Sequence, residues 1–366
     1  DTICHQGCAM SSLAIALAGF NFTLQGGMKI DPGSLNAWLV ANDGYRCLDG
    51  DCCNLVMDAP DVLTGGRMRF VGEWGGACCG GDAAKPPLSD IKRNLSPDSD
   101  EESNVVFIAH VRNRTHFVLL VSWNETAQGF DVRDPGFDTP IYAYDDISDI
   151  IMYSVIPPDA YVPKQYPLFK QYDYRWANDT MVKKTVAEVG CLMSSTSMAL
   201  NAFGVRDSES TAMNPGSLNA WLRSNGGYDA DDDMIESSIP KLSPNRVSWS
   251  DRWGMHTSND VSLETVASML SRKQPVIANV MKGRHFVLVV GLVSNELKNQ
   301  SDATTLYVND PGFYRNTYDY RADVVGWRLF NMSESPGQGK PDLSRSSHIL
   351  RSKHANPLPR FAKKAT

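Results

Sequence analysis

Residues 7–12 read GCAMSS, and residues 190–195 read GCLMSS. A second pair of motifs follows, with DPGSLNAWL at 31–39 and NPGSLNAWL at 214–222. Both pairs are 183 residues apart, so no residue is inserted or lost between the two motifs. A long spacing that stays constant is typical of an internal duplication. It predicts two domains in a chain of 366 residues.

Each half continues with a histidine and then an aspartate. HFVLL at 116–120 is matched by HFVLV at 285–289, and DPGF at 134–137 by DPGF at 310–313. A cysteine is a good nucleophile as the thiolate, which a helix N-terminus, a nearby imidazolium and a carboxylate that orients the imidazole all favour. The candidate catalytic residues are Cys8, His116 and Asp134 in the first half and Cys191, His285 and Asp310 in the second.

The local sequence predicts where these side chains lie. Residues 8–20 and 191–203 are rich in Ala, Leu and Met, which predicts helices with the cysteine in the first turn, where the helix dipole favours a negative sulfur. The β-branched runs at 105–111 and 275–280 precede the histidine segments and predict antiparallel hairpins, with the aspartate at the end of the next strand. The nucleophile and its base can then meet where the helix packs on the sheet.

The second motif predicts a further helix in each half. Asp31 and Asn214 are natural N-caps, and the following proline suits the first helical position. A third helix is predicted over 263–270, with a weaker counterpart around 88–95. Apolar residues at spacings i, i+3 and i+4, expected to pack in a core, are followed by a glycine that fits a helix end: Leu35, Trp38, Leu39 and Gly44, and Leu218, Trp221, Leu222 and Gly227.

With these motifs in this order, the sequence resembles the papain-like cysteine peptidases of the bacteriocin-processing, double-glycine leader peptidase group, and especially their secreted relatives without a transporter. In that family a Cys opens the first helix, a hydrophobic strand precedes a His-aromatic-Val strand, and an Asp-Pro completes the triad. The resemblance implies two tandem α+β domains, each with helices packed on a mainly antiparallel sheet. It also implies hydrolysis of peptide or amide bonds without a metal or other cofactor.

One position departs from the papain-like pattern. Such enzymes usually carry a Gln six residues before the nucleophile, but Thr2 and Thr185 stand there. Losing one donor to the oxyanion can cost roughly two to three orders of magnitude in rate. Gln6 is too close to Cys8 to replace it, and Gln171 can reach Cys191 only if the intervening loop folds back.

We expect the first domain at 1–156 and the second at 171–333, joined by a Pro- and Tyr-rich linker at 157–170. The second domain begins with the lead-in QYDYRWANDTMVKK, whereas only seven residues precede Cys8. Trimming of the first domain, processing of the chain and a lead-in supplied by another chain all remain open. The second pocket should be the more complete one, which makes Cys191 the better candidate nucleophile.

Six further cysteines lie in the first half: Cys4, Cys47, Cys52, Cys53, Cys78 and Cys79. An even number allows full pairing, and we expect Cys4 to pair with Cys47 and the two vicinal pairs to bridge each other. A zinc site is the alternative for such a cluster. The second half lacks all six cysteines yet keeps the rest of the motif, which favours disulfides over a metal.

Seven N-glycosylation sequons also indicate export: Asn21, Asn94, Asn113, Asn124, Asn178, Asn299 and Asn331. No stretch reaches the roughly 20 uninterrupted apolar residues of a membrane-spanning helix. The sequence given has no signal peptide, which export would in any case remove. We therefore expect a secreted or cell-surface glycoprotein.

The last residues differ in charge from the rest of the chain. Residues 334–366 carry seven Lys or Arg against two acids, which leaves a formal −12 on residues 1–333. A basic Pro-containing tail can pack on the acidic body of a neighbour and give a head-to-tail oligomer or filament, although a disordered tail is the alternative. An acidic body without a recognition motif argues against nucleic-acid binding. The acidic run at 229–233 lacks the spacing of a calcium loop and is interpreted as a solvated turn.

Two classes of function stay open. One is an extracellular cysteine peptidase or related hydrolase that acts on a peptide substrate. The other is a non-catalytic structural glycoprotein of an extracellular filament, coat or matrix, built from the same fold and assembled through its tail. Alkylation by an active-site-directed electrophile would separate the two.

Overall fold

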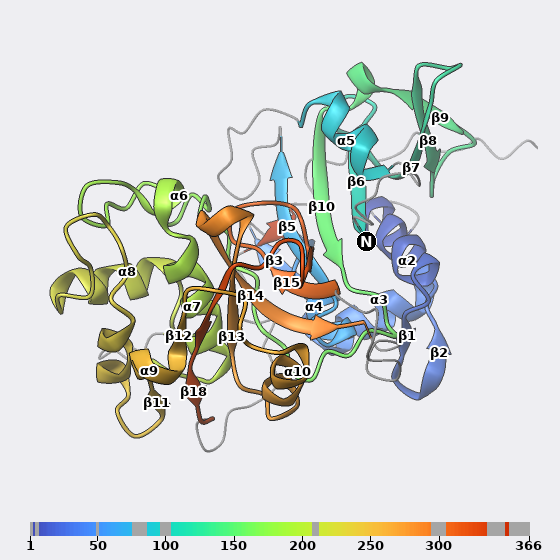
Figure 1. Cartoon of the computed structure of the whole chain (residues 1–366). Coiled ribbons are helices and arrows are strands. Elements are labelled where there is room, and N and C mark those ends of the chain that lie inside the picture. The colour runs from blue at the N-terminus through green and yellow to red at the C-terminus, as the bar shows by residue number, and fades with distance from the viewer. Residues whose placement is uncertain are drawn as a thin grey trace, which may run out of the picture. The chain divides into compact units, whose positions relative to one another are not determined.

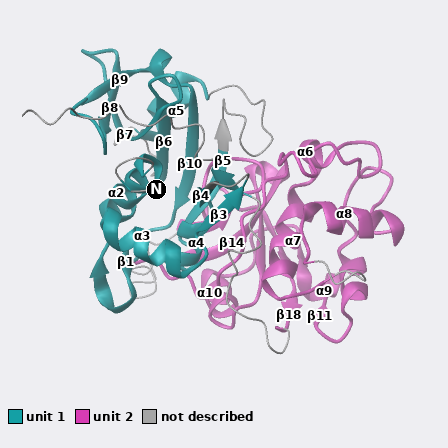
Figure 2. Ribbon diagram, turned by 180° about the vertical axis from the view of Figure 1, so that it is seen from behind, with its two compact units in different colours: residues 1–158, 341–366 teal, residues 159–340 magenta. Residues whose placement is uncertain are grey.

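The computed structural model describes residues 3, 7–48, 51–74, 86–95, 104–206, 212–293, 305–334 and 348–350. The chain forms two compact units, one of residues 1–158 with 341–366 and one of residues 159–340 (Figure 2). Cys4, Cys78, Cys79, Asn299 and most of the tail lie outside the described residues.

The first unit places helices beside a six-stranded antiparallel sheet. Its strands run in the order β5-β10-β6-β7-β8-β9. Helix α2 (Cys8–Gly19) packs on this sheet through Leu13 and Leu17, which are fully buried (Figure 1). The strands of this sheet are β5 (Met68–Trp74), β6 (Val105–Val111), β7 (His116–Asn124), β8 (Gly129–Arg133), β9 (Ile141–Ala143) and β10 (Asp149–Val155). Its other helices and short strands are α3 (Pro32–Ala41), α4 (Ala59–Thr64), α5 (Leu88–Leu95), β1 (Thr23–Leu24), β2 (Met28–Lys29), β3 (Tyr45–Leu48) and β4 (Asp51–Val56).

The second unit has a six-stranded antiparallel sheet in the order β12-β17-β13-β14-β15-β16. Helix α7 (Cys191–Ala202) contacts β14 and β13, and the sheet core includes Val287, Val289 and Trp327. The strands of this sheet are β12 (Met255–His256), β13 (Val276–Val280), β14 (His285–Leu292), β15 (Thr305–Asn309), β16 (Thr317–Asp319) and β17 (Gly326–Leu329). Its remaining elements are α6 (Val186–Val189), α8 (Pro215–Ser224), α9 (Asp251–Gly254), α10 (Leu263–Ser271), β11 (Val247–Ser248) and β18 (Asn331–Met332).

The two sheets share one sequence of connections. In each, the strand that begins with the histidine pairs with the preceding strand as a hairpin, β6 with β7 and β13 with β14. The aspartate follows β8 in the first unit and β15 in the second. The mixed α+β class with antiparallel sheets and the two histidine hairpins are thus confirmed.

The repeated PGSLNAWL motif forms the same capped helix twice. The side chain of Asp31 accepts the N–H of Ser34 at 2.8 Å, and that of Asn214 accepts the N–H of Ser217 at 3.0 Å. Each serine hydroxyl oxygen in turn accepts the cap residue's own N–H, which completes a capping box, and the hydroxyl donates to the carbonyl oxygen of the cap residue at 3.2 Å. The equivalent glycine after each helix is needed for space, because a Cβ at Gly227 would lie 2.3 Å from a Leu222 methyl carbon.

Residues 157–170 differ from the expected linker. The segment is extended, and Tyr161 pairs with Leu292 of β14 in an antiparallel bridge. Tyr166 is buried, and its carbonyl accepts a hydrogen bond from Asn309 at 3.3 Å. Residues 159–170 therefore belong to the second unit, which spans residues 159–340. The Pro residues keep the segment extended, but its aromatic side chains have enough apolar area to pack on the sheet rather than remain solvated.

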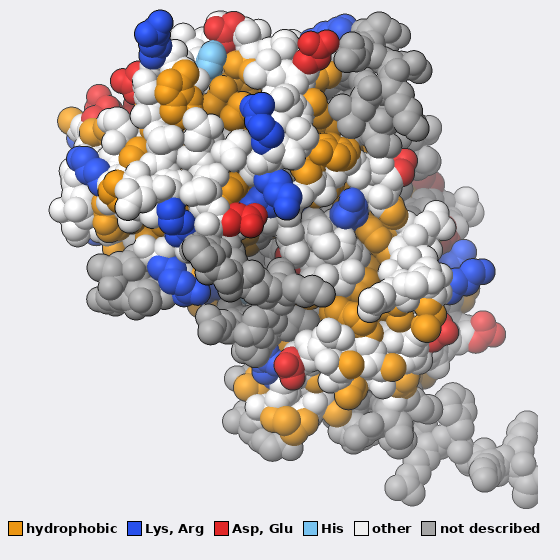
Figure 3. Space-filling model, turned by 90° about the horizontal axis from the view of Figure 1, so that it is seen from below, with side chains coloured by type: hydrophobic (Ala, Val, Ile, Leu, Met, Phe, Trp, Pro, Cys, Tyr) orange, Lys and Arg blue, Asp and Glu red, His pale blue; other side chains and the backbone are white. Residues whose placement is uncertain are grey.

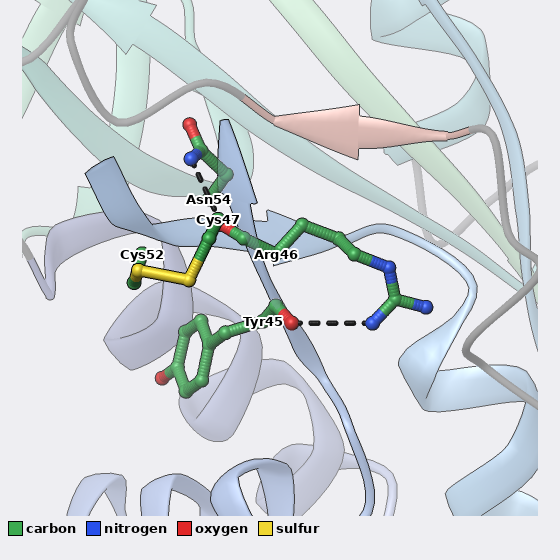
Figure 4. The surroundings of a disulfide bond; sticks show 5 residues. All are labelled: Tyr45, Arg46, Cys47, Cys52 and Asn54. Carbon is green, nitrogen blue, oxygen red and sulfur yellow. Dashed lines mark hydrogen bonds between the residues drawn. A yellow bond between two sulfur atoms is a disulfide. The ribbon is translucent and has the colours of Figure 1, made fainter. Parts of the chain in front are cut away.

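The structure pairs Cys47 with Cys52, not with Cys4 (Figure 4). The two cysteines are on adjacent strands of the β3–β4 hairpin, where a register shift between Arg46 and Leu48 places Cys47 opposite the Cys52–Cys53 step. The expected Cys4–Cys47 bridge is therefore wrong, and so is the expected bridge from Cys52 to the vicinal pair 78–79. A partner five residues away in a hairpin is close before the rest of the chain is ordered, and spacing alone did not reveal the turn between the two cysteines.

Part of the basic tail adds a strand to the first unit. β19 (Ile349–Leu350) pairs with β4, so the sheet has the order β19-β4-β3. Met57 donates its N–H to the His348 carbonyl at 2.8 Å, and the His348 ring lies 3.0 Å from the Asp58 carboxylate. These three tail residues lie on the first unit of the same chain. Packing of the tail on another chain stays a prediction.

Charge is mixed on the face of the molecule shown in Figure 3. Lys and Arg side chains are interspersed there with Asp and Glu and with apolar surface, and the residues coloured by type form no continuous basic stripe on this face. Among the described residues, no helix combines the length and the hydrophobicity that a membrane crossing requires.

Candidate active site

The GCxMSS motif fixes the cysteine helix against the histidine strand in both units. A Cβ on Gly190 would lie 2.5 Å from the Val186 carbonyl oxygen, so only glycine fits before Cys191. One turn further on, Ser195 donates its hydroxyl to the Phe286 carbonyl at 3.2 Å, next to His285. In the first unit Ser12 donates to the Phe117 carbonyl at 3.3 Å in the same way. The serine thus ties each helix to the strand that carries its histidine.

The DPGF motif positions the Asp310 carboxylate beside His285 in the second unit. His285 Nε2 lies 2.8 Å from Asp310 Oδ1, and the same oxygen accepts the N–H groups of Gly312 at 2.7 Å and Phe313 at 2.8 Å. Tyr318 donates its hydroxyl to the other carboxylate oxygen at 2.7 Å. The Phe313 ring packs edge-on against the His285 ring at 5.0 Å. A carboxylate held by four donors has one orientation, and so does the imidazole it contacts.

The first unit repeats this arrangement residue by residue. His116 Nε2 lies 2.6 Å from Asp134 Oδ1, which also accepts the N–H groups of Gly136 and Phe137, both at 2.9 Å. Tyr142 donates to Asp134 Oδ2 at 3.0 Å. Both units therefore bring the predicted histidine and aspartate together.

The charges of the second site favour an imidazolium. Burial alone would lower the pKa of His285, but hydrogen bonds to Asp310 and Cys191, together with their negative charges, raise it to about 9. Asp310 is fully buried, which by itself would raise its pKa. The hydrogen bond and charge of His285, with the charge of Lys170, hold the pKa of Asp310 below its usual range. A protonated His285 places a positive charge beside the Cys191 sulfur.

The first site has the opposite electrostatics. Burial raises the pKa of the Cys8 thiol, and the charge of Asp134 raises it further, against the backbone N–H groups of Phe117 and Ala9. Burial also lowers the pKa of His116, outweighing its bond to Asp134, and the positive charge of Arg112 lowers it further. The two sites therefore differ in protonation although their motifs are alike. The first site favours a neutral thiol and a neutral imidazole, whereas the second favours an imidazolium.

Lys170, the last residue of the expected linker, and Gln171, the first residue of the lead-in, complete the second site. Buried Lys170 donates from Nζ to the carbonyl oxygens of Asp310 at 2.6 Å and Phe313 at 2.5 Å, which holds the DPGF loop. Gln171 donates its N–H to the Pro311 carbonyl at 2.9 Å and its side-chain amide to the Ala187 carbonyl at 2.7 Å. The loop therefore does fold back. Thr185, which occupies the usual Gln position, instead caps α6 together with Glu188.

Cys191 and His285 open into a cavity of about 900 Å³ in the second unit. Gln171 and Gly312 line the same cavity, and the side-chain oxygen of Gln171 is buried without a hydrogen-bond partner. No side chain caps the N-terminus of α7, so the first N–H groups of this helix are not used by a capping residue. The cavity thus contains a nucleophile, a base and hydrogen-bond donors.

Four residues that position the cysteine helix, the histidine or the aspartate in each unit are not among the predicted site residues, although they repeat in both halves. The tyrosine eight residues after each aspartate, the second serine of GCxMSS, and the Gly and Phe of DPGF all carry defined contacts. The internal repeat could have identified them, because both halves keep these residues at the same sequence spacing from the Cys, His or Asp.

A half-buried cysteine at a helix N-terminus beside a buried His-Asp pair is the arrangement of a cysteine-peptidase-like site. Residues 163–332 match the family model of the Peptidase_C39 like family, and this match supports a C39-like cysteine peptidase domain in the second unit. Comparisons with curated proteins and with solved structures give no significant match.

The raised pKa of His285 predicts an alkaline limit to activity. Hydrolysis should hold up to about pH 9 and fall above it, because the leaving amine needs the imidazolium proton. The pH profile of kcat/KM measures this. A profile that falls near pH 6.5, the ordinary value for histidine, would contradict the assigned environment of His285.

Iodoacetamide provides a comparison within the same chain. Cys191, beside a protonated His285, should react at neutral pH, whereas Cys8 should react only above pH 9.0, the ordinary thiol value, because its pKa is raised. Mass spectrometry of the two tryptic peptides over pH 5 to 10 gives both rates. Equal rates at pH 7 would show that the two sites do not differ.

Proposed function

We propose that the second unit is a hydrolase of peptide or amide bonds that uses Cys191, His285 and Asp310. The observation that carries the proposal is the position of His285, which is hydrogen-bonded to Asp310 through Nε2 and interacts with Cys191. The Cys191 thiolate attacks the carbonyl carbon and forms a tetrahedral intermediate. His285 then gives its proton to the leaving amine, which leaves an acyl-thioester.

Deacylation uses the same groups in reverse. Neutral His285 takes a proton from water, the resulting hydroxide attacks the thioester, and the thiolate leaves and re-forms its pair with the imidazolium. Asp310 keeps the ring in place throughout, since its four donors leave it one orientation. No step needs a metal or an organic cofactor.

Gln171 and the N-terminus of α7 are suited to stabilise the oxyanion. The side-chain amide of Gln171 uses one hydrogen for the Ala187 carbonyl and has a second, and Cys191, whose backbone N–H is at the start of α7, lines the same cavity. Two such donors supply the kind of electrostatic stabilisation that is worth roughly two to three orders of magnitude each. Gln171 thus takes the role that Thr185 cannot.

We also propose that the two units are tandem copies of one papain-like domain and that only the second is catalytic. Support comes from the shared strand order and from the matching contacts of both aspartates. The first copy keeps the architecture, but its Cys8 is held as a thiol and Arg112 disfavours the charged form of His116.

Secretion as a glycoprotein remains part of the proposal. Of the described sequon residues, Asn21, Asn113, Asn178 and Asn331 are exposed and Asn94 and Asn124 are half-buried. A glycosyltransferase and its product can be accommodated at exposed positions. The Cys47–Cys52 disulfide agrees with an oxidising compartment. Mass spectrometry after enzymatic deglycosylation tests each site.

The structural alternative has one observation in its favour. A strand as short as β19, in the middle of a basic tail, could pair with β4 of another copy as well as with that of its own chain, and repeated exchange would give a filament. The mass of the full-length and tail-deleted proteins in solution tests this. Two monomers at high concentration would argue against assembly and in favour of a secreted enzyme.

Digestion of a peptide mixture tests the enzymatic proposal. The full-length glycoprotein is incubated at pH 7 with proteome-derived peptides, and new termini are identified by mass spectrometry. We expect new termini that disappear after treatment with iodoacetamide. The absence of any cleavage, with Cys191 shown to be unmodified, would contradict the proposal.

A further inference from the structure

The cavity beside Cys191 carries an excess of negative charge. Its lining includes two guanidinium groups, from Arg284 and Arg328, against six carboxylates. The six acidic residues are Glu188, Asp229, Asp232, Asp233, Glu236 and Asp251. The Arg328 guanidinium is already paired with Glu236, so it offsets one carboxylate only. The formal excess is four negative charges in one cavity.

Asp232 stands out among these residues because it is buried. Its exposed fraction is 4%, and its Oδ1 accepts the N–H groups of Val182 at 2.7 Å, Lys183 at 2.8 Å and Lys184 at 3.2 Å. Its other oxygen, Oδ2, is buried and has no hydrogen-bond partner. Three backbone donors keep the residue ionised, since they lower its pKa although burial opposes them. A buried carboxylate oxygen without a partner is costly unless a ligand satisfies it.

The neighbouring aspartates repel one another, and the charges of Lys183 and Arg328 offset only part of this repulsion. The residue Asp233 is exposed overall and lines the cavity. Partial burial of its carboxylate raises its pKa, and the negative charges of the three neighbouring aspartates raise it further. Asp229 is exposed as well and accepts the N–H groups of Asp231 and Asp233. Like charges at this density destabilise the empty site, and a bound cation would relieve them.

The arrangement of the carboxylates indicates whether the cation is a metal ion or a charged side chain. Within the described part of the chain, no three His, Cys, Asp or Glu side chains are grouped so that they could hold a metal ion. The carboxylates are spread along a cavity whose lining also includes the apolar side chains of Leu192 and Phe313, of which Phe313 is exposed. A long side chain with an apolar stem and a cationic end suits such a surface, as Lys and Arg have.

We infer that the cavity of the second unit binds peptides with a Lys or Arg side chain, whose cationic end reaches Asp229, Asp232 and Asp233. The inference rests on the proposed hydrolysis at Cys191 and adds the chemical class of its substrate. Charge complementarity of this kind raises both the rate of encounter and the discrimination between substrates. Acidic peptides would be rejected by the same carboxylates.

Matched peptides test the inference with the full-length protein. A peptide cut in the digestion experiment is made with Lys or with norleucine, its uncharged analogue, at each position within four residues of the scissile bond. At one position we expect kcat/KM to be about tenfold or more higher for Lys, as for one or two good ion pairs. The ratio should fall in 1 M NaCl, where charges are screened.

Variants assign the ratio to these carboxylates. Asp233→Asn removes the charge of an exposed residue, and Asp232→Asn keeps an oxygen for the three backbone donors while it neutralises the buried side chain. Either change should lower the Lys/norleucine ratio about threefold or more. The matched control is Glu264→Gln, an exposed acid in the first turn of α10, outside the lining of the cavity, where the ratio should not change.

The outcomes separate the two proposals. Cleavage of both peptides at equal rates at every position would overturn the preference for cations and leave hydrolysis at Cys191 standing. The absence of any cut peptide in the digestion experiment would overturn hydrolysis and the inference with it. A preference that survives both aspartate variants would show that other residues bind the cation, which also overturns this assignment.

Discussion

Cys191→Ala should lower the hydrolysis of any peptide substrate by at least about 10⁴-fold, since it removes the nucleophile from a triad whose members act as a unit. The fold should survive, because alanine is an excellent helix former and Cys191 is only half-buried in the first turn of α7. Initial rates, together with the thermal midpoint Tm, separate the loss of chemistry from a loss of structure.

Cys8→Ala is the matched control for this variant. It changes the same residue at the equivalent helix position of the first unit, where the thiol stays protonated. Turnover should fall less than about twofold, within the range of ordinary neutral substitutions. Equal losses in the two variants would mean that both units act, and undiminished turnover in Cys191→Ala would refute the assignment of the nucleophile.

Gly312→Ala should cost about 10²-fold or more in kcat/KM without touching a triad residue. A Cβ at this position would lie 2.9 Å from Cε1 of His285 and 3.2 Å from the side-chain oxygen of Gln171, so the imidazole has to move. A displacement of this order at the reacting groups is expensive. The measurement is kcat/KM for the variant, with the iodoacetamide rate at Cys191 as a second readout.

Gly136→Ala makes the same change in the first unit. Its Cβ would lie 2.8 Å from Cε1 of His116, so the steric conflict is as severe. We expect the His116 ring to be displaced in the same way, with little change in turnover. A large loss of activity in Gly136→Ala and none in Gly312→Ala would reverse the assignment of the active unit.

Much of this architecture could be predicted from the repeats. The two helices with an N-terminal cysteine, the capped helices after Asp31 and Asn214, and the histidine hairpins depend on local patterns that recur at a constant spacing. Local periodicity, capping and turn chemistry act over a few residues, so the sequence displays them directly.

Contacts between distant segments could not be predicted in the same way. The position of Gln171 depends on Lys170 and Pro311, which lie about 140 residues apart in sequence. The difference between the two sites also escaped the motif, since it depends on burial and on the nearby charge of Arg112 rather than on the triad residues. Residue identity at a triad specifies geometry, whereas its surroundings specify protonation.

The disulfide was mispredicted because sequence spacing treats every cysteine pairing alike. The hairpin β3–β4 brings Cys47 and Cys52 together through its register, which the composition of the turn did not reveal. The prediction for the tail was based on its positive charge. The structure instead shows residues 348–350 held to β4 and Met57 by backbone hydrogen bonds.

The most direct test of the central claim is the mapping of an active-site label. The full-length protein is treated at pH 7 with a peptidyl ketone electrophile that carries lysine next to its reactive carbon, and the tryptic peptides are identified by mass spectrometry. The account predicts one label per chain, on Cys191, and no label when His285 is replaced by alanine. Equal labelling of Cys8 and Cys191, or no label on Cys191 in the folded protein, would contradict it.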